Sequence, residues 1–286
     1  MVFAIPDPLR KISKKQLHCL EIAIMSTDQE SPCVWDGIVD AFPESESDHV
    51  WDSERWVTSV FKALSSPGAI GGANKTAPSE LSLVHEYPLP PIAALLATYK
   101  TDSPLRILDF GGGSGNSFMA CIHSLPDPQK IEYHIVEGKR ICEKGREIYA
   151  NFNNIYYHDS LPVGESRFHI VHIAAALHYI RDWRGLLKQL LNYQPDVLML
   201  NALNAGDIKT FVSFQNYYGE KIPVWFWNIS EVTEYVQSRG YHLIYKSLLE
   251  FSFLGKIQLL PMQNFPSEYR LERKCNLIFG SPTLRD

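Results

Sequence analysis

RILDFGGGSGNS, residues 106–117, is the stretch that decides the fold. A short apolar run ends at Asp109, a glycine-rich bend follows, and a helix-compatible segment begins at Ser117. The glycines allow a sharp bend and leave main-chain N–H groups open to a ligand, because no Cβ atom stands in the way. This order of elements is typical of the first strand, loop and helix of a nucleotide-binding α/β unit.

The chain after this stretch alternates short apolar runs with segments of helical spacing. We expect helices at 117–122, 139–150 and 183–192, and further strands at 131–136, 154–157, 168–173 and 196–201. Strands that alternate with helices in this way predict a parallel, doubly wound α/β sheet with right-handed crossovers.

Past residue 204 the pattern changes. Residues 211–227 are rich in aromatic side chains, and 230–240 reads as a helix with Ser230 as its N-cap and a glycine at its end. Strand candidates at 241–250 and 274–279 then predict an antiparallel hairpin at the edge of the sheet.

The N-terminal part differs from this core. Helical apolar spacing recurs there at 11–25, 53–64 and 92–97, separated by polar and acidic stretches. We therefore predict two parts: a mainly helical N-terminal extension or cap over residues 1–100, and a core domain over residues 101–286.

Composition excludes several classes of function. The net charge is −5 and no dense Lys/Arg block occurs, so a nucleic-acid partner is not expected. No apolar run approaches the roughly 20 residues of a membrane span, and no secretory signal is recognised, so we expect a cytoplasmic protein. The five cysteines are scattered, without a CxxC pair, and the histidines are dispersed, so no metal site is predicted.

The glycine-rich bend can be compared with three known kinds of loop. A phosphate-binding P-loop needs a lysine, which is missing, and a dinucleotide fingerprint would place its third glycine at Asn116, although a variant dinucleotide site stays open. An acid followed by GxGxG is matched completely by Asp109, Gly111, Gly113 and Gly115. This pattern resembles motif I of the class I S-adenosylmethionine-dependent methyltransferases.

That resemblance implies a seven-stranded, Rossmann-like methyltransferase sheet and S-adenosylmethionine as the cofactor. Glu137, at the end of the second strand, would accept hydrogen bonds from both ribose hydroxyls, and Asp159 would accept from the adenine amino group. Asp109 would act near the methionine end, partly through water. The remaining expected contacts are the loop glycines Gly111, Gly112, Gly113 and Gly115, and Ala174 and Ala175 beneath the cofactor.

A closer resemblance extends from about residue 35 to the C-terminus. It rests on WDG at 35–37, DFGG at 109–112, YHIVE at 133–137, LHYI at 177–180, Gln215 before PVW at 223–225, and GY at 240–241. As a set these elements resemble a family of bacterial methyltransferases often associated with surface-polysaccharide and O-antigen biosynthesis. The resemblance implies a sugar or a small hydroxylated substrate. The chain departs from the family at His169, where an acid is usual, and at His178, where glutamine is usual.

Residues on the acceptor side are harder to identify. A hydroxyl acceptor needs a general base near neutral pH, and His178, just after the fourth strand, is the first candidate. Gln215, Tyr217 and Trp225 could line a sugar pocket, although aromatic residues in such a segment also pack as core.

The sequence thus predicts a methyltransferase that acts on a hydroxyl of a sugar, a glycan precursor or another small metabolite. Two alternatives stay open: an NAD-linked oxidoreductase or epimerase on a Rossmann sheet, and a non-catalytic methyltransferase-like protein. The acceptor and the oligomeric state are not indicated.

Overall fold

A computed structural model describes residues 33–44, 50–62, 88–99, 104–164, 167–217, 219–253 and 256–284. The helix predicted at 11–25 lies outside these residues. Within them, no helix is both long and apolar enough to cross a membrane.

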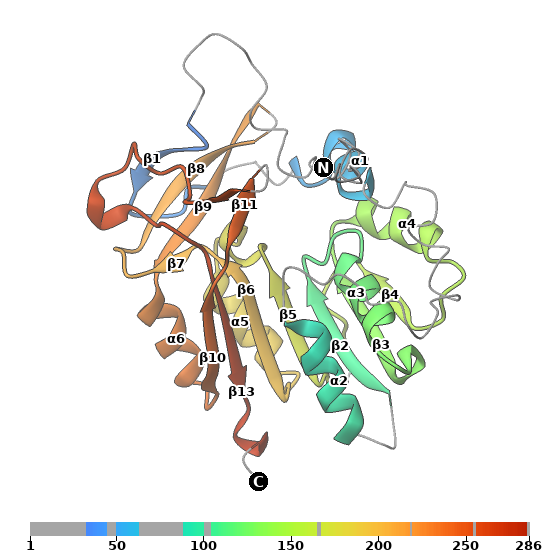
Figure 1. The fold of residues 1–286 in the computed structure, drawn as a ribbon. Helices are drawn as coiled ribbons and strands as arrows, with labels where there is room; N and C mark the ends of the chain where they lie inside the picture. The colour runs from blue at the N-terminus through green and yellow to red at the C-terminus, as the bar shows by residue number, and fades with distance from the viewer. Residues whose placement is uncertain are drawn as a thin grey trace, which may run out of the picture.

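The centre of the molecule is a seven-stranded sheet with the order β10-β13-β6-β5-β2-β3-β4 (Figure 1). Five neighbouring strands are parallel, and β13 and β10 are antiparallel additions at one edge, which confirms the predicted sheet and terminal hairpin. The strand bounds are β2 (Leu105–Phe110), β3 (Ile131–Val136), β4 (Ile155–His158), β5 (Ile170–Ala174), β6 (Val197–Leu203), β10 (His242–Leu248) and β13 (Cys275–Gly280).

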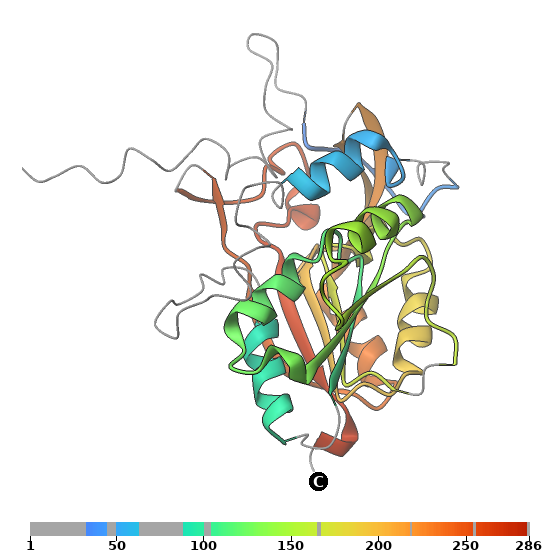
Figure 2. The same cartoon turned by 90° about the vertical axis from the view of Figure 1, so that its right-hand side faces the viewer.

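Helices cover both faces of this sheet because its strands are apolar on both sides (Figures 1 and 2). On β2, Ile107 belongs to one buried cluster and the next residue, Leu108, to the other. The first cluster contains α2 (Leu89–Tyr99), α3 (Asn116–Ser124) and α4 (Lys139–Ile148), and the second contains α5 (Trp183–Leu191) and α6 (Ile229–Gln237). Short 3-10 turns are η5 (Pro128–Lys130), η6 (Leu177–Tyr179), η7 (Ser267–Tyr269) and η8 (Pro282–Leu284).

Helix α6 begins two residues earlier than predicted, because its N-cap is Asn228 rather than Ser230. The Asn228 side chain accepts a hydrogen bond of 2.9 Å from the backbone N–H of Ser230. Asn and Ser are comparable N-caps, so the sequence pattern alone did not separate the two positions.

A second, smaller sheet lies beyond the carboxyl ends of the parallel strands, and we call it the cap sheet (Figure 1). It consists of β1 (Trp35–Val39), β8 (Phe211–Tyr217), β9 (Glu220–Asn228) and β7 (Ala205–Gly206), in the order β1-β8-β9-β7. Trp35 pairs with Gln215, so the chain before residue 100 contributes a strand to the part that follows β6. The division into 1–100 and 101–286 stays a prediction. The other elements outside the main sheet are α1 (Glu54–Lys62) and the hairpin of β11 (Phe251–Phe253) and β12 (Lys256–Gln258).

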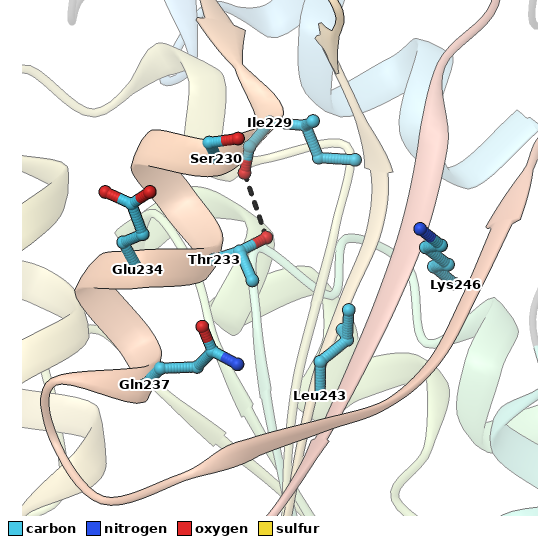
Figure 3. A pocket seen from close by; sticks show the side chains of 7 residues that line it. All are labelled: Ile229, Ser230, Thr233, Glu234, Gln237, Leu243 and Lys246. Atoms are coloured by element: carbon cyan, nitrogen blue, oxygen red, sulfur yellow. Dashed lines mark hydrogen bonds between the residues drawn. The ribbon is translucent and has the colours of Figure 1, made fainter.

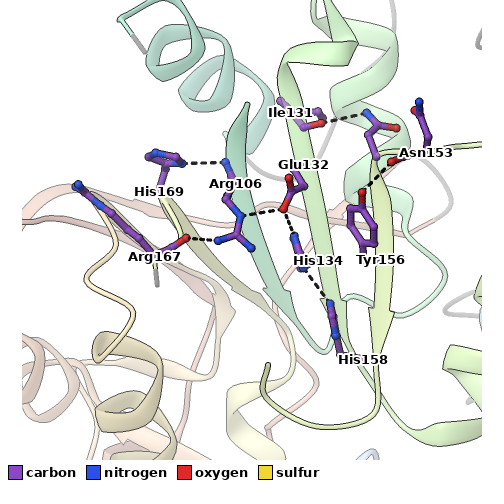
Figure 4. A network of polar contacts seen from close by, with 10 residues as sticks. Arg106, Ile131, Glu132, His134, Asn153, Tyr156, His158, Arg167 and His169 are labelled. Carbon is purple, nitrogen blue, oxygen red and sulfur yellow. Dashed lines mark hydrogen bonds and ion pairs between the residues drawn. The ribbon is translucent and has the colours of Figure 1, made fainter. Parts of the chain in front are cut away.

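Charged and imidazole side chains form a polar network across β2, β3 and β4 (Figure 4). Arg106 Nε donates to Glu132 Oε1 at 2.8 Å, and the same oxygen lies 2.7 Å from His134 Nε2. Burial alone would raise the pKa of Glu132, but hydrogen bonds from His134 and Arg106, with the Arg106 charge, lower it. His169, where an acid is usual in the resembling family, accepts a hydrogen bond of 2.9 Å from the backbone N–H of Arg106.

A second chain of buried polar contacts runs through the interior of the sheet. Tyr133 on β3 donates to Asp109 Oδ2 on β2 at 2.7 Å, and Asp109 Oδ1 lies 3.0 Å from Nδ1 of His172 on β5. His172 Nε2 lies 3.0 Å from Asn201 Oδ1 on β6, and Asn201 Nδ2 donates to Asn276 Oδ1 on β13 at 3.2 Å. These contacts join five adjacent strands by side chains as well as by backbone.

The donor and acceptor roles along this series of contacts follow from one backbone group. The N–H of Ala202 donates to Asn276 Oδ1 at 3.0 Å, so the Asn276 oxygen, not its nitrogen, faces β6. Asn201 must then donate its amide N–H to Asn276 and present its oxygen to His172. His172 Nε2 is therefore the donor in its contact with Asn201 Oδ1.

A substitution at Gly145 tests whether packing or helix propensity has the larger effect on stability in the interior of α4. Gly145→Ala would place a Cβ 2.3–2.6 Å from ring atoms of Tyr157. Alanine favours a helix by about 1 kcal/mol over glycine, but overpacking costs about 1–3 kcal/mol. We expect a net loss of stability in urea unfolding, whereas exposed Glu143→Ala on the same helix should stay within about 0.5 kcal/mol of the parent. A stabilised Gly145→Ala protein would contradict the close packing of Tyr157.

His172 tests the buried chain. His172→Phe removes the contact to Asp109, which is only 1% exposed and then keeps Tyr133 as its side-chain donor. A buried polar group that loses a partner costs about 1–3 kcal/mol, and we expect that loss in urea unfolding. The control is His242→Phe on edge strand β10, where the histidine is half-buried and takes no part in these polar contacts. Equal stability of the two variants would show that the His172 contacts contribute nothing to the free energy of unfolding.

Candidate functional site

The glycine loop, residues 111–115, connects β2 to α3 at the carboxyl edge of the sheet. Gly111 and Gly113 have φ of 72° and 56°, in the left-handed region that favours glycine. A Cβ on Gly111 would also lie 2.4 Å from the Cβ of Ala176, so the loop packs against the turn after β5. Both the conformation and the contact therefore require glycine at Gly111.

Glu137 follows β3 and holds the glycine loop from the side. Its Oε1 accepts a hydrogen bond of 3.2 Å from the N–H of Gly113, and its Oε2 accepts one of 2.9 Å from the N–H of Gly138. Burial raises the pKa of Glu137, the two backbone hydrogen bonds lower it in part, and the negative charge of Asp109 raises it further. Each carboxylate oxygen keeps a second lone pair that can accept another hydrogen bond.

Asp109 lies beneath the loop rather than on its open side. Both of its oxygens contact side chains of the buried chain, Tyr133 and His172. A Cβ on Gly112 would lie 2.7 Å from Asp109 Oδ2, so the loop backbone rests directly on this carboxylate. The structure places Asp109 as a support for the loop, and its predicted role near the methionine end stays a prediction.

The other predicted cofactor residues end neighbouring strands at the same edge. Asp159 follows β4 and is exposed, and Ala174 is the last residue of β5 and half-buried. Ala175 has a φ of 53°, and its N–H donates to the backbone oxygen of Asn201 at 3.0 Å. Together with Glu137 and the loop, these residues line the carboxyl ends of β2, β3, β4 and β5, where open α/β sheets bind ligands.

Helix α1 and the turn before it cover the glycine loop. A Cβ on Gly113 would lie 3.6 Å from Val60 Cγ1, so α1 approaches the loop closely. Arg140, near the start of α4, donates from Nη1 to the backbone oxygen of Asp52 at 2.9 Å and pairs with Glu54 at 3.6 Å. The sequence predicted a helix here but gave no reason to place it over the loop.

An aromatic cluster lies next to this cover and is formed by three separate segments. The Trp51 ring lies 5.1 Å from that of Trp56, 4.6 Å from that of Tyr179 and 6.1 Å from that of Tyr217, between centroids. The Tyr179 hydroxyl donates to Gln215 Oε1 at 2.8 Å. The structure therefore brings Gln215 and Tyr217 together and adds Trp51, Trp56 and Tyr179, which were not predicted as site residues.

Trp225 does not join this cluster. In the β8–β9 pairing, Gln215 is opposite Ile222 whereas Trp225 is opposite Val212, so Trp225 and Gln215 point to opposite faces of the cap sheet. The Trp225 ring stacks on Trp227 with centroids 6.3 Å apart. Alternation along β8 and β9 would have separated these residues, but strands were not predicted in the aromatic segment.

His178 lies in η6, directly after β5, and is 1% exposed. Its Nδ1 is buried and has no hydrogen-bond partner among the described residues. Burial lowers the pKa of His178 well below its usual value, and the positive charge of Lys274 lowers it further. The imidazole is therefore neutral at pH 7, the form that can accept a proton, and its role as the base stays a prediction.

A metal site and a surface groove were the other possible functional sites, and neither involves the predicted site residues. In the described part of the chain, no group of three His, Cys, Asp or Glu side chains could hold a metal ion. A groove lies between α6 and β10, and Thr233 within it bonds to its own helix through the backbone oxygen of Ile229 (Figure 3). None of the predicted site residues lines this groove.

The chain is similar in fold to several solved methyltransferases. One is the 1,6-didemethyltoxoflavin-N1-methyltransferase of Burkholderia thailandensis with bound S-adenosylhomocysteine: 10% identity, TM-score 0.47, covering 85% of this chain and 94% of that one. Another is a S-adenosylmethionine-dependent methyltransferase, so described, of Listeria monocytogenes: 11% identity, TM-score 0.44, covering 66% and 97%. A third is the magnesium protoporphyrin IX methyltransferase of Synechocystis with bound S-adenosylhomocysteine: 11% identity, TM-score 0.43, covering 68% and 81%. No curated protein matches the sequence significantly.

The family comparison covers more than half of the chain. A family described as "Methyltransferase domain" matches residues 83–246, which include the glycine loop, Glu137, Asp159 and Ala174. The chain belongs to this methyltransferase-domain family.

Proposed function

We propose that the protein transfers a methyl group from S-adenosylmethionine to a hydroxyl of a small molecule such as a sugar or a glycan precursor. The observation that carries this proposal is the Glu137 carboxylate, which holds the glycine loop and keeps an acceptor site on each oxygen. The two ribose hydroxyls of the cofactor are donors of the kind that such a carboxylate binds. This donor and acceptor set fits S-adenosylmethionine and contains no lysine for a pyrophosphate.

The chain's own residues then have distinct parts in the reaction. When bound, the cofactor supplies a methyl group already activated on a sulfonium. Glu137, Asp159 and the loop N–H groups orient the cofactor, and Ala174 and Ala175 leave room beneath it. Positioning of an acceptor against the methyl group accounts for much of the catalysis in such a displacement.

The acceptor lies, on this proposal, against the aromatic cluster of Trp51, Trp56, Tyr179 and Tyr217. Aromatic faces bind the apolar faces of rings, and Gln215 adds a polar group at the edge of the cluster. Neutral His178 is the candidate for removal of the acceptor's proton. A cytoplasmic location and the absence of a nucleic-acid partner complete the proposal.

A direct assay separates this function from the alternatives. The protein is incubated with methyl-labelled S-adenosylmethionine and a panel of sugars, nucleotide sugars and phenols, and labelled product and S-adenosylhomocysteine are measured. NAD is titrated in parallel. We expect binding of S-adenosylhomocysteine and label on a hydroxyl. Binding of NAD alone would overturn the proposal, and cofactor binding without transfer to any acceptor would favour a non-catalytic protein.

Glu137→Ala tests the cofactor site. Loss of a charged acceptor for two hydroxyls should weaken S-adenosylhomocysteine binding by about 1.5–3 kcal/mol in calorimetry. Glu143→Ala, on an exposed face of α4, is the matched control and should bind like the parent. Unchanged affinity in a folded Glu137→Ala protein would show that Glu137 does not bind the ribose.

The same site predicts a pH dependence. Because burial raises the pKa of Glu137, its carboxylate takes up a proton at a higher pH than an exposed glutamate does. Protonation removes acceptor capacity, so affinity for S-adenosylhomocysteine should fall as the pH decreases through this pKa. A Glu137→Gln protein should lack this part of the pH dependence. If parent and variant follow the same curve, another group is responsible.

Trp51→Ala and Trp225→Ala compare the two faces of the cap sheet, because Trp51 packs on the face that presents Tyr217. Trp51 contacts the rings of Trp56, Tyr179 and Tyr217, whereas Trp225 lies on the other face. With an acceptor from the panel, Trp51→Ala should raise KM about threefold to tenfold, since an aromatic contact contributes about 0.5–1.5 kcal/mol. Cofactor affinity should be unchanged in both variants. A larger effect on KM from Trp225→Ala would place the acceptor elsewhere.

A further inference from the structure

Three polar groups that have no hydrogen-bond or ion-pair partner among the described residues come together at the carboxyl edge of the sheet, on the side away from β4. They are the Nδ1 of His178 in η6, the Oδ1 of Asn204 directly after β6, and the ammonium of Lys274 directly before β13. His178 and Asn204 are each 1% exposed. None of the three atoms has a hydrogen bond or an ion pair within the described part of the chain.

The strand register places these groups next to one another. Cys275 on β13 pairs with Leu203 on β6 in the antiparallel direction, so Lys274 and Asn204 are opposite each other where the two strands end. The turn η6 packs against β6 and β9, which brings His178 to the same end. The positive charge of Lys274 acts on His178, consistent with this proximity.

Each group lacks a different kind of partner. The Asn204 amide nitrogen already donates to the backbone oxygen of Trp225 at 3.3 Å, so the free Asn204 oxygen needs a donor such as a hydroxyl. Lys274 can only donate, and burial lowers its pKa to about 8. A half-buried ammonium in this state is stabilised by an anion.

We propose that Lys274, Asn204 and His178 form a subsite for an oxyanion that carries a neighbouring hydroxyl group, as in a hydroxy acid or a sugar phosphate. Lys274 binds the oxyanion, Asn204 accepts from the hydroxyl, and the neutral imidazole of His178 forms a hydrogen bond at Nδ1. The subsite lies at the same sheet edge as the glycine loop, since β2, β5 and β6 are parallel neighbours. As an acceptor subsite it rests on the proposed function, and it restricts the methyl acceptor to acidic molecules.

The experiment follows the lysine signals of the full-length protein, labelled with 13C at lysine Cε, by NMR. Lys274 is assigned from the spectrum of Lys274→Arg, and exposed Lys246 on β10 is the internal control. Glycolate, acetate and inorganic phosphate are titrated at constant ionic strength set with sodium chloride, with and without S-adenosylhomocysteine.

We expect a saturable shift of the Lys274 signal with glycolate or phosphate, tighter binding of glycolate than of acetate, and no saturable shift of Lys246. The midpoint of the Lys274 titration should rise when the anion is bound. Above the midpoint of the anion-free protein, affinity for the anion should fall about tenfold for each pH unit, because only the ammonium form of Lys274 binds.

The outcomes separate the possible ligands and the two proposals. Binding of glycolate alone identifies a hydroxy acid, and binding of phosphate identifies a phosphate ester. A Lys274 signal that moves no more than Lys246, or equally with chloride, overturns the subsite. Because the titration is also made without S-adenosylhomocysteine, a failure of cofactor binding would contradict the proposed function and leave the result on the subsite intact.

Discussion

The carboxylate of Asp109 is the group on which the arrangement of the site depends. It is buried at the end of β2, bound by Tyr133 on one side and by His172 on the other, and the backbone of Gly112 lies directly on it. A buried carboxylate is tolerated only where its oxygens are satisfied, so the strands on both sides must keep their register for the loop to keep its shape. The chain of contacts continues through Asn201 to Asn276, which links the shape of the loop to the antiparallel edge of the sheet.

The sequence predicted the main sheet well because its signals are local. Each buried strand is a short apolar run, and each helix between the strands has its own spacing of apolar residues, as in α5. The glycine loop was identified for the same reason, since the positive φ of Gly111 and Gly113 favours glycine through the local backbone conformation alone. Glu137 was predicted as a cofactor residue because it stands at the end of a predicted strand.

The proposed acceptor side could not be predicted in the same way, because its residues come from segments far apart in the chain. Nothing local to Trp51 indicates that it will meet Tyr179 and Tyr217. The pairing of β1 with β8 depends on tertiary structure, and without strands in 211–227 the opposite orientations of Gln215 and Trp225 could not be read. Lys274 gave no signal as a single lysine before a strand. Its proposed role rests on its having no partner in the described part of the chain, which only the fold shows.

Part of the proposed acceptor site lies outside the region that matches the family. The region shared with the family, residues 83–246, contains the glycine loop and Glu137, whereas Trp51, Trp56 and Lys274 lie outside it. β1 pairs with β8 at the edge of the cap sheet, and Lys274 directly precedes β13. If the acceptor binds as proposed, substitutions in these two flanking segments can alter the choice of acceptor without changing the region that contains the glycine loop and Glu137.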